Sequence, residues 1–103
     1  MDKLMIANPF STTAANQAGQ MLAKIVIDSV PLSAQKSELK HAKKVSVSMT
    51  KMAQHIEWLK LQHSFNFFQK AKLGTTLQWQ LKDAGYDVSY ARELTEWVMM
   101  RLK

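Results

Sequence analysis

Cysteine is absent from the sequence, and its absence excludes three kinds of site. The chain has no disulfide framework, no thiolate nucleophile and no cysteine-ligated zinc. A chain of 103 residues can bury a core without such cross-links, so we expect one domain, residues 1–103, that folds on its own. A cysteine-free chain is compatible with a reducing compartment, and the cytoplasm is the expected location.

Glycine and proline are scarce, with three and two residues respectively. So few turn-forming residues leave little room for a β architecture, which favours helices. Long apolar runs are also missing, because no window approaches the ~20 apolar residues of a membrane-spanning helix. The N-terminus lacks a basic stretch followed by a sustained apolar run. We therefore expect neither a cleaved signal peptide nor a transmembrane segment.

The sequence does contain a strong helical periodicity between Met49 and Leu73. Apolar side chains recur there every three or four residues, at Met49, Met52, Ile56 and Leu59, and then at Leu61, Phe65 and Phe68. The pattern predicts one long central helix, covered on several sides by the rest of the chain. The first apolar seam is lost at His63 and Asn66, which predicts different neighbours for the two halves. Gly74 is expected to end the helix.

The beginning of this helix has two interpretations. The apolar face continues backwards from Met49 to Ala42, so the helix is expected to start near Ala34, after a cap at Ser33. Residues 45–49 also alternate between apolar and polar side chains and include β-branched valines. A break or a short strand at these residues is therefore the alternative.

Three shorter helices are expected around the central one. The first follows a cap at Ser11 or Thr12 and ends near Asp28 or Ser29, because Pro31 disfavours helix in the residue before it. The other two are Thr76 to Ala84, opened by a Thr75/Gln78 capping box and stopped by Gly85, and a last helix that follows Asp87 or Ser89 and runs nearly to Lys103.

The predicted fold class is therefore all-α, an irregular bundle of about four helices around one long central helix. Residues 1–10 are expected to be a loosely ordered lead-in. Trp58, Trp79 and Trp97 fall on three different predicted helices, which indicates one core that receives an indole from each.

The net charge of +6 is concentrated in the middle of the chain, where eight lysines and two glutamates lie between residues 36 and 72. Five of these lysines form a basic stripe on the predicted helix, namely Lys36, Lys40, Lys43, Lys44 and Lys51. Such a stripe can meet an acidic protein or the phosphates of a nucleic acid, or it can simply solvate an outer face. Lysine lacks the bidentate fork of arginine, so contacts with nucleic acid would carry little sequence specificity.

Four aromatic residues form a second candidate surface, an apolar girdle of Trp58, Phe65, Phe67 and Phe68. They present more aromatic area than one face of a helix buries against its own chain, so self-association as a homodimer is the expected use. Core packing by the first and last helices is the alternative.

Motifs for chemistry are missing from the sequence. Neither a glycine-rich phosphate loop nor a set of paired catalytic carboxylates occurs. His55 and His63 are eight residues apart, which is not a ligand spacing on one helix, so no metal or cofactor is expected. The segment from Leu77 to Met99 resembles a helix-turn-helix in spacing, but its second helix would present Glu93 and Glu96 to phosphates.

These patterns together predict a non-enzymatic regulator, adaptor or inhibitor that acts through protein–protein contacts and self-associates. The alternative is a nucleic-acid-binding accessory protein that places Lys36 to Lys51 on phosphates, with Leu77 to Met99 as a weak reading motif.

Overall fold

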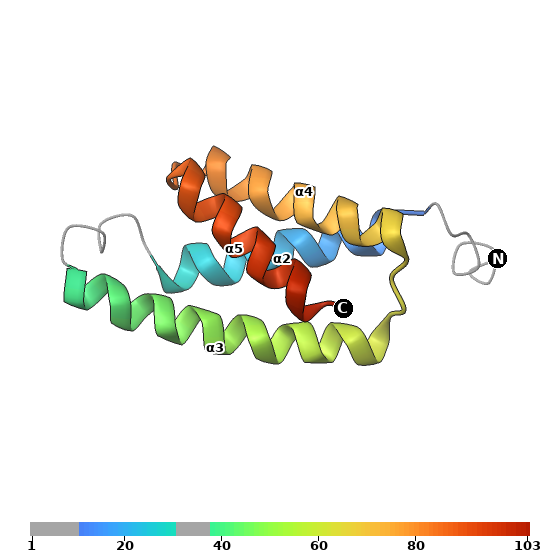
Figure 1. Cartoon of the computed structure of the whole chain (residues 1–103), viewed down its shortest axis with the longest axis horizontal. Coiled ribbons are helices and arrows are strands. Elements are labelled where there is room, and N and C mark those ends of the chain that lie inside the picture. Colours follow the sequence, from blue (N-terminus) through green and yellow to red (C-terminus); the bar gives the residue numbers. More distant parts are fainter. Residues whose placement is uncertain (1–10, 31–37) are drawn as a thin grey trace.

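The computed structural model describes residues 11–30 and 38–103, with side chains described from residue 43 in the second range. The elements in these ranges are four α-helices: α2 (Thr13–Ser29), α3 (Glu38–Gln62), α4 (Phe67–Asp83) and α5 (Val88–Arg101) (Figure 1). No strand occurs in either range, so the all-α prediction is confirmed. The predicted lead-in at residues 1–10 and the predicted cap at Ser33 lie outside the described residues.

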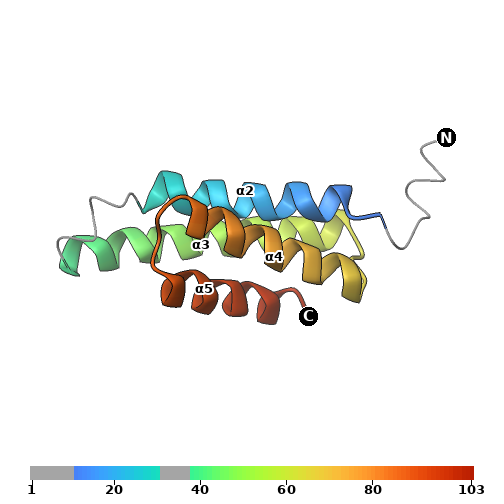
Figure 2. The same ribbon diagram turned by 90° about the horizontal axis from the view of Figure 1, so that it is seen from above.

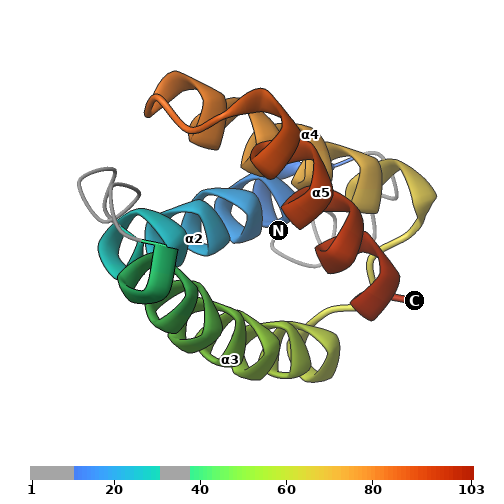
Figure 3. The same cartoon turned by 60° about the vertical axis from the view of Figure 1, so that its left-hand side comes forward.

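Helix α2 is in contact with both α3 and α4. It packs against α3 on one side and against α4 on another (Figure 3). In Figure 2, α4 in turn lies between α2 and α5. The chain directions of α2 and α3 are opposite, so the end of α2 lies beside the beginning of α3 (Figure 1).

The predicted helix from Met49 to Leu73 is wrong in its second half. Helix α3 is continuous through residues 45–49, where a break was the alternative, but it ends at Gln62. A new helix begins at Phe67 because Asn66 and Gln69 form a capping box. The Asn66 side chain accepts from the Gln69 backbone N–H at 2.9 Å, and the Gln69 side chain accepts from the Asn66 backbone N–H at 2.9 Å.

The predicted helix end at Gly74 is also wrong, as is the predicted Thr75/Gln78 capping box. Both lie inside α4, and Gly74 is buried where α4 meets α5. A Cβ at this position would lie 3.0 Å from the Met99 sulfur, so the glycine allows close packing rather than ending a helix. Gly85 does follow the end of the helix, as predicted, with a φ of 98° that favours glycine.

Small residues on α2 set its distance from α4. Ala15, Ala18 and Gly19 are buried, and a Cβ on Gly19 would lie 2.7 Å from the Leu73 carbonyl oxygen. Apolar residues of α5 and its C-terminal cap, three or four positions apart, form the other side of the core and are all buried, namely Ala91, Leu94, Val98 and Leu102.

The three tryptophans do not share one core, which corrects the sequence-based prediction. Trp58 is 51% exposed and Trp79 is 63% exposed. Only Trp97 packs against the core, with the Arg101 guanidinium 5.2 Å from its ring centre. Helix α3 is covered mainly by α2, and the Trp58 indole lies at the edge of this contact, where it remains half exposed.

Candidate functional site

Two separate hollows lie along the outer edge between α2 and α3, and together with the surface between them they outline a groove. On α2 its edge is formed by Ala14, Gln17, Met21 and Asp28, and on α3 by Lys44, Val47, Lys51, His55 and Trp58. Steps of three, four or seven residues place each set on one side of its helix. Because the two helices are antiparallel, the start of α2 faces the end of α3 (Figure 1). We call this surface the α2–α3 groove.

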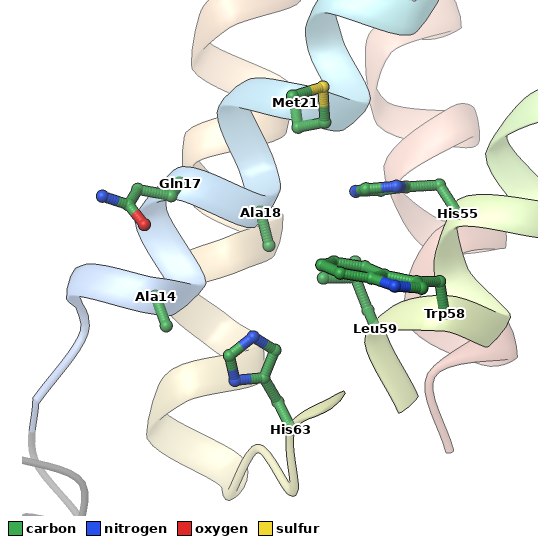
Figure 4. A pocket seen from close by; sticks show the side chains of 8 residues that line it. All are labelled: Ala14, Gln17, Ala18, Met21, His55, Trp58, Leu59 and His63. Atoms are coloured by element: carbon green, nitrogen blue, oxygen red, sulfur yellow. The ribbon is translucent and has the colours of Figure 1, made fainter. Parts of the chain in front are cut away.

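One end of the groove contains an aromatic hollow of about 230 Å³. Its lining, shown in Figure 4, is Ala14, Gln17, Ala18, Met21, His55, Trp58, Leu59 and His63. Ala18 and Leu59 are buried and form its floor, whereas Met21 is 45% exposed and Trp58 is 51% exposed. The hollow therefore presents an apolar surface between two more exposed side chains.

The imidazole of His55 stacks on the indole of Trp58, with ring centres 5.4 Å apart and planes 21° from parallel. In Figure 4 the two rings lie one over the other and point towards α2. Burial lowers the pKa of His55 below its usual value of 6.5, because the charged imidazolium loses hydration there. At neutral pH His55 is therefore mainly uncharged, and this part of the hollow stays apolar.

The other end of the groove contains a basic hollow of about 290 Å³ beside the end of α2. It is lined by Asp28, Ser29, Lys43, Lys44, Val47 and Lys51. Asp28 is engaged by Lys24, whose Nζ lies 3.2 Å from Oδ2. The other ion pair among the described side chains joins Lys60 to Glu57, so Lys43, Lys44 and Lys51 leave an excess of positive charge at this end.

The structure thus brings together three members of the predicted basic stripe. Lys36 and the side chain of Lys40 lie outside the described part of the chain. Val47 lies between the lysines and is 51% exposed, so the basic hollow also offers some apolar surface.

The four residues of the predicted apolar girdle do not share one surface. Trp58 borders the aromatic hollow, whereas Phe65 packs against the core and stacks on His63 with ring centres 4.8 Å apart. Phe67 and Phe68 are 81% and 58% exposed at the beginning of α4, and their rings meet edge to face. The aromatic area is therefore divided between the groove, the core and the α3–α4 corner.

The helix-turn-helix candidate, Leu77 to Met99, corresponds to the last part of α4, the turn at Gly85 and most of α5. Ala91 and Leu94 are buried, as that interpretation requires, but Glu93 and Glu96 are exposed on α5. A different hollow, outside the α2–α3 groove, lies beside this segment. Its lining includes both Arg92 and Glu96, so its charge is mixed. This surface is less suited to phosphates than the basic hollow is.

Titratable residues do not gather into a metal centre in the described ranges, where no group of three His, Cys, Asp or Glu residues could hold an ion. His55 and His63 both line the aromatic hollow, although their sequence spacing is not that of ligands on one helix.

No described helix combines the length and the apolar character needed to cross a membrane.

Sequence reasoning missed the contribution of α2 to this site. Met21 and Gln17 are exposed residues of α2, and nothing in the local sequence pattern identifies the helix they approach. Their role follows from the antiparallel pairing with α3, which depends on contacts between distant residues.

In comparisons with known proteins, the chain matches no protein-family model, no curated protein and no solved structure.

Proposed function

We propose that this is a non-enzymatic binding protein, a small regulator, adaptor or inhibitor, that holds a segment of a partner protein in the α2–α3 groove. The observation that carries the proposal is the aromatic hollow, in which Trp58 and Met21 stand half exposed beside a buried apolar floor. Tryptophan and methionine are enriched where proteins meet, because both offer a large contact area.

The mechanism is occupancy of a surface. Burying the exposed parts of Trp58 and Met21 removes apolar area from water, and a tryptophan next to a hollow is the kind of residue on which binding energy concentrates. The lysines of the basic hollow add a long-range attraction that speeds the encounter with a negatively charged partner.

Affinity capture from native lysate tests this proposal when two tryptophan variants are compared. Trp58→Ala removes the indole beside the groove, and Trp79→Ala is the matched control because it removes an exposed indole from α4. We expect wild type and Trp79→Ala to retain the same proteins, and Trp58→Ala to lose them. Nuclease treatment should leave the captured proteins in place. Retention of nucleic acid alone, lost after nuclease, would contradict the proposal and favour the nucleic-acid alternative.

Self-association is a second candidate, supported by a different surface. Leu61 and Phe67 are 84% and 81% exposed on either side of the α3–α4 turn. Large apolar side chains that are this exposed are a common feature of contacts between copies of a chain. Sedimentation of wild type should show dimers that Phe67→Ser disrupts, and a monomer at high micromolar concentration would remove this candidate.

A further inference from the structure

We infer that the segment held in the α2–α3 groove is an acidic amphipathic helix of another protein. This inference rests on the proposed function and assigns the chemistry of the partner. It comes from the order of features along the groove, which is apolar at one end and basic at the other.

The length of the groove corresponds to that of a short helix. Lys44 and Trp58 are separated by about four helical turns of α3, or ~21 Å at 1.5 Å per residue. A partner helix that lies along the groove can reach both hollows with about 15 residues. Side chains three or four residues apart line one face of such a helix, so apolar side chains at one of its ends can contact Met21 and Trp58.

The positive charge at one end of the groove indicates that the partner segment carries negative charge. Lys43, Lys44 and Lys51 border the basic hollow, and the one carboxylate there, that of Asp28, is already engaged by Lys24. Acidic side chains on the partner would complete the charge balance at this end. A second copy of this chain carries a net charge of +6, so long-range repulsion opposes it as the occupant.

The same order of features favours a protein over a nucleic acid. A nucleic acid carries negative charge along its whole length, whereas the lysines occupy only one half of this groove. In the other half His55 is mainly neutral, and the floor formed by Ala18 and Leu59 is apolar. A segment that is acidic at one end and apolar at the other matches both halves.

Designed peptides test this inference on the full chain. The first probe is a fluorescein-labelled helical peptide of about 18 residues, with a leucine and phenylalanine face at one end and four glutamates at the other. The second has the same apolar face and glutamine in place of each glutamate. The third keeps the glutamates and replaces the apolar face with serine. Binding is measured by fluorescence anisotropy, together with binding of a labelled single-stranded oligonucleotide.

Two double charge reversals provide matched variants. Lys44→Glu with Lys51→Glu changes the basic hollow, and Lys72→Glu with Lys82→Glu makes the same change in net charge on α4, where both lysines are exposed. We expect the acidic amphipathic peptide to bind most tightly. We expect the groove reversal to weaken it roughly tenfold or more and the α4 reversal to change it much less.

The outcomes separate this inference from the proposed function. Equal binding of the glutamate and glutamine peptides, lost with Trp58→Ala, would overturn the acidic assignment and leave the proposed function standing. Peptide binding that is the same in wild type and Trp58→Ala would overturn both. Oligonucleotide binding that displaces the peptide and falls with the groove reversal would overturn the inference in favour of a nucleic acid.

Discussion

The carbonyl oxygen of Leu73 on α4 faces the α-carbon of Gly19 on α2, so closely that a Cβ there would lie 2.7 Å from the oxygen. The same Cβ would lie 2.9 Å from the Cβ of Thr76. The Thr76 hydroxyl lies 2.7 Å from the side-chain oxygen of Asn16, to which it donates a hydrogen bond across the same interface. These contacts fix α2 on α4, and α2 forms one wall of the α2–α3 groove.

Gly19→Ala should therefore destabilise the protein. The added methyl group meets backbone, which cannot move aside without separating the two helices. We expect the free energy of unfolding to fall by about 2 kcal/mol, even though alanine favours helix over glycine by about 1 kcal/mol. Urea denaturation followed by circular dichroism measures the change.

Gly74→Ala is the matched control for this change. A Cβ at Gly74 would lie 3.0 Å from the Met99 sulfur, which belongs to a flexible side chain. The gain in helix propensity then offsets the small rearrangement, and we expect a change of less than about 1 kcal/mol. Equal destabilisation by both alanines would contradict the close contact between α2 and α4.

Tyr86→Phe should also lower stability, because it removes a link between the end of α2 and the α4–α5 turn. The buried Tyr86 hydroxyl donates a hydrogen bond to the Val30 carbonyl oxygen. Without the hydroxyl, the Val30 carbonyl oxygen loses its hydrogen-bond donor, and we expect the free energy of unfolding to fall by about 1–3 kcal/mol. Burial and the nearby charge of Asp28 raise the pKa of Tyr86, so wild type should lose this contribution as the pH rises above 10, and Tyr86→Phe should not.

His55 predicts a pH dependence of stability in the acidic range. Its pKa is lowered in the folded protein, so between that pKa and 6.5 the unfolded chain binds more protons than the folded one. The stability that comes from the neutral imidazole is complete above pH 6.5 and is lost as the pH falls. Thermal unfolding at pH 7 and pH 5 should show a larger decrease for wild type than for His55→Gln. An identical decrease would show that His55 is not desolvated.

Reversing the charge of Lys44 and Lys51 should leave the fold intact. Neither lysine takes part in the two ion pairs found among the described side chains, so we expect the free energy of unfolding to change by less than about 1 kcal/mol. The association rate with the acidic peptide should fall, because the lysines steer the encounter. Stopped-flow mixing at low and high salt measures the rate, and an unchanged rate at low salt would contradict the steering role.

Much of the helical framework follows from local signals. The end of α2 near Ser29 and the end of α4 before Gly85 are indicated by a proline and a glycine, whose backbone preferences act within one turn. The inward face of α5 follows from the spacing of its apolar residues, and that face is buried against the core.

The division of the predicted central helix could not be read from spacing alone. Phe65 and Phe68 continue a helical pattern through the break, so periodicity gives no warning of it. Two capping-box patterns lie nearby, Asn66 with Gln69 and Thr75 with Gln78, and only the first begins a helix. The choice depends on α4 folding back against α2, where Gly19 and the buried Thr76 meet.

Only the α3 side of the candidate site could be predicted from the sequence. Lys43, Lys44, Lys51 and Trp58 are identifiable from charge and aromatic content on one helix. Met21 and Gln17 come from another helix, and their position at the groove is set by tertiary packing.

The central claim is that the α2–α3 groove is the surface that binds the acidic amphipathic peptide, and NMR of the ¹⁵N-labelled protein tests it most directly. Titration with the peptide should shift the indole N–H resonance of Trp58 and the backbone resonances of Met21 and Lys51 in a saturable manner. The indole resonance of Trp79, which is exposed on α4, should remain in place. Saturable shifts at Trp79 and along α5, with Trp58 and Met21 unchanged, would contradict the claim.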